Sequence, residues 1–213
     1  MKLILVRHGR TIANVMRALD TAFPGNPLDE VGRAQAEQLP ERLARGGHLE
    51  AISSLWVSPI LRARQTIAPI ESATGLSARI ESGLREVLAG DLEMSTAVGS
   101  MRCYVDTTRS WMVGRLAARI PGSLEDGEST FARFNEVVTR IGQETPEGGT
   151  ALLVAHGTVL RLWTALAAAT AAGADPAWIA DHPMGNTGIT LIEGDPQDGW
   201  RLVDWNEGAW RAP

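Results

Sequence analysis

Two apolar segments, far apart along the chain, end in the same way. Residues 3–11 read LILVRHGRT and residues 151–159 read ALLVAHGTV, so each apolar run leads into a His-Gly pair with a threonine close behind. Imidazole can act as a nucleophile or a proton carrier near neutral pH, and glycine lets the backbone turn sharply and approach a ligand. One histidine at a strand end is commonly structural, but His8 and His156 in matched contexts indicate one shared site.

Two arginines strengthen this interpretation. Arg7 directly precedes His8, and Arg62 lies in the segment 58–66, SPILRARQT, at the start of an expected helix. A buried guanidinium without an anionic partner is costly, and its planar donors suit the oxygens of a phosphoryl group. Two guanidiniums and two imidazoles around one crevice therefore predict a site for a dianionic phosphate ester, whereas we interpret Arg64 as a surface residue.

Alternating strands and helices explain how distant residues could meet. The patterns predict strands at 2–6, 51–57, 77–80 and 150–155, and helices at 29–44, 59–73, 126–143 and from about 158. This order predicts an α/β three-layer sandwich, with a mostly parallel sheet and helices on both faces. Residues 187–192 and 200–205 flank a turn and predict an antiparallel C-terminal edge. Ligands bind beyond the carboxyl ends of such strands, where both histidines are expected.

Length and composition limit the class of protein. The 213 residues suit one domain, 1–213, in which about 92–130 lack a strand pattern and are expected to form a small helical lid insertion. A net charge of −5 gives no reason to expect a nucleic acid or an anionic membrane as partner. Cys103 is the only cysteine, and the N-terminal apolar run is too short for a signal peptide. We therefore expect a soluble cytoplasmic protein.

Four segments in order along the chain resemble the histidine phosphatase superfamily, also called the phosphoglycerate mutase-like family. LVRHGRT resembles its nucleophile motif, SPILRARQT its second arginine motif and VAHGTVLRL its distal histidine motif. LREVLAGDLE, residues 84–93, is similar to the segment that holds the proton donor of that family. The resemblance covers residues 3 to about 205.

The resemblance implies a role for each matched residue. His8 would attack phosphorus and become phosphohistidine, while Arg7, Arg62 and His156 would hold the phosphoryl oxygens, where charge spreads in the transition state. The backbone at Gly157 would approach the phosphate.

The remaining roles concern the leaving group and a side-chain amide. Glu86 would protonate the leaving alkoxide and later activate water, with Glu93 and Asp91 as alternatives. Asn14 matches a family position that often contacts phosphate through its side-chain amide. The implied activity is hydrolysis of a small phosphorylated metabolite, without metal or organic cofactor.

Departures from the family pattern and rival interpretations remain. Arg10 stands where glutamate or glutamine is common, and the Gly-Trp-x-Asp segment of the mutases is missing, which favours a phosphatase over a mutase. Arginines 102, 109 and 115 of the lid could bind a second anionic group or belong to solvated helix faces. Two rivals are a metal site of His8, His156 and Glu86, and a non-catalytic phosphate-binding module. We interpret the C-terminal tryptophans, Trp200, Trp205 and Trp210, as packing for the edge strands, with a contact in a homo-oligomer as the alternative.

Overall fold

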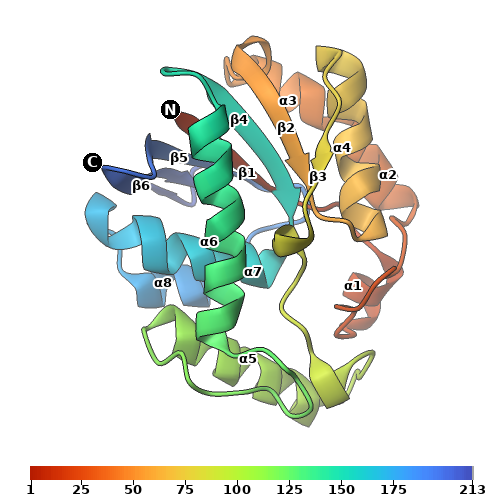
Figure 1. The fold of residues 1–213 in the computed structure, drawn as a ribbon. Coiled ribbons are helices and arrows are strands. Elements are labelled where there is room, and N and C mark those ends of the chain that lie inside the picture. The colour runs from red at the N-terminus through yellow and green to blue at the C-terminus, as the bar shows by residue number, and fades with distance from the viewer. Residues whose placement is uncertain (213) are drawn as a thin grey trace.

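The chain forms one seven-stranded sheet between two layers of helices (Figure 1). The computed structural model describes residues 1–212. The strands lie in the order β3-β2-β4-β1-β5-β6-β7. Their bounds are β1 Lys2–Arg7, β2 Ile52–Val57, β3 Arg79–Ile80, β4 Thr150–Ala155, β5 Ile189–Asp195, β6 Gly199–Trp205 and β7 Trp210–Arg211. The strands β3, β2, β4 and β1 are parallel, and β5, β6 and β7 extend the sheet by antiparallel pairing.

Eight α-helices connect or flank these strands in the described part of the chain. Their bounds are α1 Ile12–Met16, α2 Glu30–Glu37, α3 Leu39–Arg45, α4 Leu61–Thr74, α5 Val98–Met112, α6 Gly127–Glu144, α7 Gly157–Thr164 and α8 Pro176–Asp181. Shorter turns of helix are η1 Leu49–Ala51, η2 Ser82–Leu84, η3 Gly90–Leu92, η4 Ala165–Ala169 and η5 Thr170–Ala172. The α/β three-layer prediction is confirmed. Among residues 1–212 there is no helix with both the length and the apolar character needed to cross a membrane.

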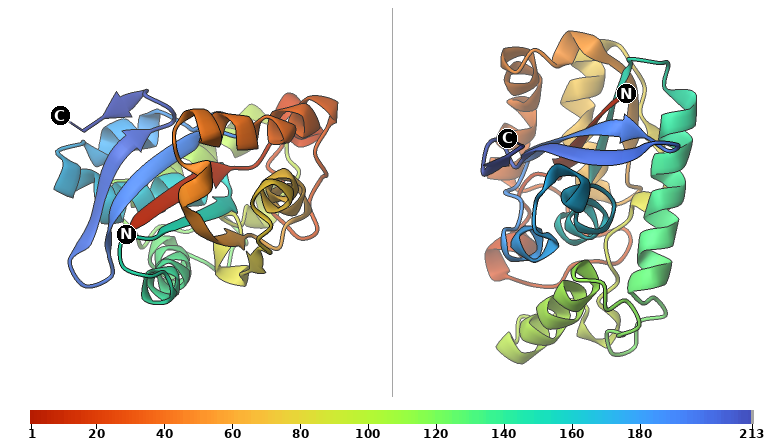
Figure 2. Two further views of the ribbon diagram at one scale, coloured as in Figure 1. Left: turned by 90° about the horizontal axis from the view of Figure 1, so that it is seen from above. Right: turned by 90° about the vertical axis from the view of Figure 1, so that its left-hand side faces the viewer.

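Alternation along β1 divides the core into two halves. Leu3 and Leu5 face the layer that contains α6 and α7, whereas Ile4 and Val6 face α3 and α4, because successive side chains of a strand point to opposite faces. The left panel of Figure 2 shows the strands passing between these layers. The sheet is therefore buried on both faces, which agrees with its nearly continuous apolar strands.

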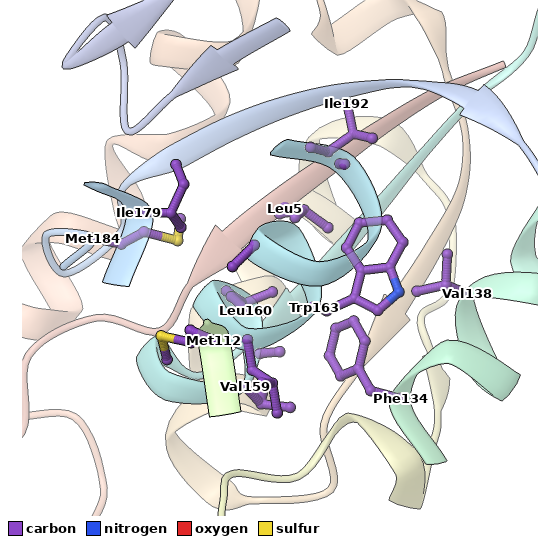
Figure 3. Packing of buried hydrophobic residues seen from close by; sticks show 14 of the residues in the cluster. Leu5, Met112, Phe134, Val138, Val159, Leu160, Trp163, Ile179, Met184 and Ile192 are labelled. Carbon is purple, nitrogen blue, oxygen red and sulfur yellow. The ribbon is translucent and has the colours of Figure 1, made fainter. Parts of the chain in front are cut away.

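Trp163 of α7 is the centre of the larger half of the core (Figure 3). Its ring centroid lies 6.1 Å from that of Phe134 on α6 and 5.8 Å from that of Trp200 on β6. Its Nε1 donates to Asn135 Oδ1 at 3.0 Å. This packing fixes α7, and with it the backbone that follows His156.

Two helix predictions need correction. The expected helix at 29–44 is two helices, because Pro40 has no amide hydrogen to donate and instead lies in the first turn of α3. Asp29 caps α2 as expected, with its carboxylate accepting from the Gly32 amide. The helix predicted from Pro59 begins only at Leu61. The short helices α1 and α8 were not predicted, since five or six residues carry little periodicity.

Candidate active site

The two histidines meet beyond the carboxyl ends of β1 and β4. These strands pair in parallel with Arg7 opposite Ala155, so the residues that follow, His8 and His156, leave the sheet side by side. Their ring centroids are 5.2 Å apart. In Figure 1 the arrowheads of β2 and β4 point toward the end of the molecule where α1 and α5 lie.

Hydrogen bonds define the protonation state of His8. Its Nδ1 lies 2.7 Å from the carbonyl oxygen of Gly9, which can only accept, so Nδ1 carries the hydrogen. The Nε–H of Arg62 points at Nε2 from 3.1 Å, so Nε2 has the lone pair. Burial, and then the charges of Arg62 and Arg7, hold the pKa of His8 well below its usual 6.5. His8 is therefore a neutral imidazole with a free electron pair on Nε2.

The turn after His8 depends on close backbone packing. A Cβ on Gly9 would lie 2.6 Å from the carbonyl oxygen of Gly32, so no larger residue fits without displacing backbone. The Gly9 amide donates to Thr66 Oγ1 of α4 at 2.9 Å, and that hydroxyl donates to the Arg62 carbonyl at 2.7 Å. The same contacts thus fix both the nucleophile and the start of α4.

Arg7 and Arg62 supply the cationic part of the site. Arg62 is 2% exposed, and its Nη2 donates to the carbonyl of Asp20 at 2.9 Å, with Nη1 3.4 Å from the Asp20 carboxylate. Burial lowers the pKa of Arg7 to about 10, against the opposing attraction of Glu86. Both guanidiniums remain charged at neutral pH.

Two buried nitrogens beside His8 find no hydrogen-bond partner within the protein. They are Nε of Arg7 and Nδ1 of His156. His156 is fully buried, and its other nitrogen, Nε2, lies 2.7 Å from Ser58 Oγ. Burial, followed by the charge of Arg62, lowers the pKa of His156 well below 6.5. Buried donors are nearly always satisfied, so these atoms mark where an oxygen-rich ligand would bind.

Glu86 lies at the N-terminus of α7, where it is 8% exposed. Its carboxylate accepts from the backbone amides of Val87 at 2.8 Å, Val159 at 2.9 Å and Thr158 at 3.0 Å. These three amides fix the orientation of the carboxylate. No sequence pattern indicated that three backbone amides would donate to Glu86.

The alternative carboxylates lie elsewhere. Glu93 accepts from the Thr21 and Ala22 amides and so holds the loop that carries Asp20. Asp91 packs against Gly122. Arg10 forms an ion pair with Asp29 at 2.8 Å and lies outside the pocket. Of the candidate proton donors, Glu86 is the one that lines the pocket.

These residues surround a pocket of about 200 Å³. Its lining includes the predicted residues Arg7, His8, Asn14, Arg62, Glu86 and Gly157. His156 lies behind this lining, fully buried against His8. A Cβ on Gly157 would lie 3.1 Å from Nε of Arg7, so glycine allows the guanidinium to lie against the α7 backbone.

Three residues that line or support the pocket were not predicted from the sequence. Asn186 donates through Nδ2 to the His8 carbonyl and to Asn14 Oδ1, both at 3.1 Å, so the Asn14 amide nitrogen is available to the pocket. Arg161 also lines the pocket, and its place one helical turn after Gly157 could have indicated this. Arg133 of α6 donates to the carbonyls of the Glu86 loop. No motif identifies Asn186 or Arg133.

The lid arginines do not enter the pocket. Arg102 and Asp106 form an exposed pair on α5, and Arg109 forms an ion pair with Asp181 at 2.7 Å. Arg115 is exposed and does not line the pocket. Arg102 and Arg109 therefore belong to solvated faces of α5, and Arg115 lies in the exposed segment that follows this helix. Within residues 1–212, no group of three or more histidine, cysteine or acidic side chains could hold a metal ion.

Comparisons with known proteins agree with this geometry. The family profile of the histidine phosphatase superfamily (branch 1) matches residues 3–208. The glucosyl-3-phosphoglycerate phosphatase of Mycobacterium tuberculosis is 31% identical over 227 residues, covering 98% of this chain and 95% of that protein. A mycobacterial glucosyl-3-phosphoglycerate phosphatase solved with VO3 superposes with a TM-score of 0.77 at 26% identity, covering 97% of this chain and 98% of that one.

Two further relatives match less completely. PE_PGRS11 of M. tuberculosis is 28% identical over 221 residues, which cover 94% of this chain, but the chain spans only 35% of that protein's length. A probable phosphoglycerate mutase, GpmB, of Yersinia pestis is 32% identical over 163 residues, covering 75% of this chain and 71% of that protein. The fuller match in both sequence and structure is therefore to phosphatases.

Proposed function

This chain belongs to the histidine phosphatase superfamily (branch 1), and we propose that it hydrolyses small phosphate monoesters through a phosphohistidine at His8. The observation that carries the proposal is the buried, neutral His8 imidazole, whose Nε2 lone pair accepts a hydrogen bond from Nε–H of Arg62. A neutral nitrogen nucleophile within a cationic pocket is what attack on a phosphate dianion requires.

In the first step, Nε2 of His8 attacks phosphorus, the N–P bond forms and the bond from phosphorus to the alcohol oxygen breaks. The Nε–H of Arg62 exchanges its hydrogen bond to His8 for one to a phosphoryl oxygen, which frees the lone pair of Nε2. Nε of Arg7, Nδ1 of His156 and the amide of Asn14 donate to the other oxygens. Phosphoryl transfer depends mainly on such alignment and charge stabilisation.

Glu86 serves first as the proton donor and then as the proton acceptor. Its protonated form gives a proton to the departing alkoxide, and the resulting carboxylate then takes a proton from water as water attacks the phosphohistidine. Phosphate leaves and neutral His8 is restored. The three amides on Glu86 hold its carboxylate in position at the pocket for both transfers.

We further propose that residues 92–130 act as a lid within one domain. The α5 residues Met101, Tyr104 and Val105 support this proposal, since they line the pocket. The net charge of −5 supports a small-molecule substrate over a nucleic acid. One cysteine in 213 residues supports a cytoplasmic location.

The decisive experiment combines phosphate release with chemical trapping. A panel of phosphate monoesters should yield inorganic phosphate, and the quenched enzyme should carry a label at His8 that is lost in acid and kept in base. His8→Ala should abolish both signals, and EDTA should change neither. An unchanged rate in His8→Ala would reject the mechanism.

The mutase alternative has its own test. Incubation with 3-phosphoglycerate, with and without 2,3-bisphosphoglycerate, distinguishes isomerisation from release of phosphate. Any turnover of this ester by a phosphatase, even if slow, gives free phosphate and no 2-phosphoglycerate in both incubations. Net formation of 2-phosphoglycerate without phosphate release would assign this chain to the mutases.

A further inference from the structure

One side of the pocket is apolar. We call this surface the apolar wall; its residues are Ala18, Leu19, Met101, Tyr104, Val105 and Pro183. They come from the segment after α1, from α5 and from the segment after α8. The phosphate-binding donors come instead from the ends of β1 and the starts of α1, α4 and α7. The wall is therefore placed to contact the alcohol part of a bound ester.

The face of α5 that contributes to the wall also carries Val98. Val98, Met101 and Val105 follow one another at spacings of three and four residues, so they share one face of the helix. Val98 is 84% exposed and Val105 is 41% exposed. An apolar surface beside the phosphate-binding donors favours a ligand with an apolar part, because contact between the two removes apolar surface of both from water.

The charge of the pocket matches a single phosphate dianion. With Glu86 protonated, as its role as proton donor requires, the guanidiniums of Arg7, Arg62 and Arg161 exceed the carboxylate of Asp20 by two positive charges, which one phosphate dianion offsets. Arg161 already donates to the Gly157 and Ala180 carbonyls. A carboxylate or second phosphate on the substrate would therefore add negative charge beyond what these three guanidiniums offset.

We propose that the natural substrate is the phosphate monoester of an apolar alcohol, aryl or alkyl, without a second anionic group. This inference rests on the proposed phosphatase activity and narrows its substrate class. The proposed substrate class differs from that of the relatives whose names specify a phosphoglycerate. Those substrates carry a carboxylate in addition to the phosphate, whereas the charge of this pocket matches the phosphate alone.

The test compares three phosphate esters whose leaving groups are aliphatic alcohols of similar acidity. A difference in kcat/KM then reports recognition of the alcohol part rather than the chemical reactivity of the ester. They are benzyl phosphate, glycerol 1-phosphate and 3-phosphoglycerate. We expect kcat/KM for benzyl phosphate to exceed the value for each of the others by about tenfold or more, as apolar pockets discriminate by such factors. Equal values, or a preference for 3-phosphoglycerate, would overturn the substrate class.

A substitution in the wall gives an independent check. Val105→Asn should reduce the ratio of kcat/KM between benzyl phosphate and glycerol 1-phosphate by about fivefold, on the order of one lost apolar contact. Val31→Asn is the matched control, because Val31 is 44% exposed on α2 and lies outside the pocket. An equal change of this ratio in both variants would contradict the proposal that the apolar wall contacts the alcohol part of the substrate.

The outcomes also separate this inference from the proposed function. Phosphate release from 3-phosphoglycerate alone would end the inference and leave the phosphatase standing, whereas release from no ester would end both. Sedimentation of the wild-type protein and Val105→Asn tests a second copy as the occupant of the wall. Loss of a dimer in Val105→Asn, with the substrate ratio unchanged, would assign the wall to self-association and overturn the inference.

Discussion

Nε of Arg62 lies 3.1 Å from Nε2 of His8 and donates its hydrogen to that atom. The contact has two consequences. It requires the lone pair of His8 to be on the nitrogen that faces the pocket, and it places a fixed positive charge against the imidazole. Burial and this charge together lower the pKa of His8 well below 6.5. The nucleophile is therefore unprotonated across the neutral range without help from a general base.

The activity should consequently persist on the acid side of neutrality. A lowered pKa means that His8 remains neutral at every pH above that pKa, so kcat should not fall through protonation of His8 between pH 7.5 and 6. NMR of ring-labelled histidine should show His8 as the Nδ1–H tautomer throughout this range. A titration of His8 near pH 6.5 would contradict this prediction.

Arg62→Met should change both the rate and the protonation of the nucleophile. Loss of a charged donor to the transferring phosphoryl group should cost on the order of 100-fold in kcat or more. Because the Arg62 charge is one cause of the low pKa of His8, the pKa should move upward toward 6.5. Arg64→Met on the same helix is the control, and it should alter neither quantity.

Acid should destabilise the fold through both histidines. The pKa values of His8 and His156 lie well below 6.5 in the folded state, so unfolding at a pH below 6.5 takes up protons that the folded protein does not bind. Stability is therefore full above pH 6.5 and declines as the pH falls, with a slope that approaches about 1.4 kcal/mol per pH unit for each histidine. Urea unfolding between pH 7.5 and 5 measures this decline.

A variant identifies the source of that decline. His156→Gln removes one of the two titrating groups and should reduce the slope by up to half. His48, which is partly exposed, provides the comparison, since His48→Gln should change the slope less. The same acid dependence in wild-type protein and His156→Gln would place the titrating groups elsewhere.

Sequence patterns predicted the part of the site that strands and short motifs position. Parallel pairing of β1 with β4 follows from their matching apolar runs, and it is sufficient to bring His8 and His156 together. Arg62 was predictable because a helix start after a parallel strand lies at the same edge of the sheet. These residues are fixed by local structure plus one simple sheet topology.

The remaining residues depend on tertiary contacts that no local pattern records. Asn186 reaches His8 and Asn14 from a position 172 or more residues later in the chain. The lid arginines illustrate the opposite case, since α5 rotates Arg102 and Arg109 toward acidic partners and leaves Met101 and Val105 at the pocket. The choice between those helix faces is made by packing, and periodicity alone does not determine which face meets a ligand.

Asn186→Ala should reduce activity without removing any group that contacts the phosphate. The Asn14 amide would lose the donor that fixes its orientation, and the His8 carbonyl would lose a hydrogen bond. We expect kcat/KM to fall by about tenfold, the equivalent of one or two ordinary hydrogen bonds. Asn135→Ala is the control, because Asn135 bonds to Trp163 and lies outside the pocket. Equal losses in both variants would indicate a general effect on folding.

Arg133 holds the loop that carries Glu86. Its Nη1 donates to the carbonyls of Gly83 and Arg85, both at 2.8 Å, and its Nη2 donates to the Glu86 carbonyl at 3.0 Å. Glu125, which is 8% exposed, in turn accepts from Arg133 Nε at 2.9 Å. The position of the proposed proton donor therefore depends on a buried ion pair on α6 and the segment before it.

Removing this support should impair proton transfer more than binding. Arg133→Met alone would leave Glu125 paired only with Arg85, so the double variant Arg133→Met, Glu125→Gln is the better test. We expect kcat for benzyl phosphate to fall by about 10–100-fold with little change in KM, because general acid catalysis contributes a factor of that order or more. Phenyl phosphate releases a more acidic alcohol that needs less help from an acid, so its kcat should fall less. A loss of equal size for both esters would mean that Arg133 supports the fold alone and does not position Glu86.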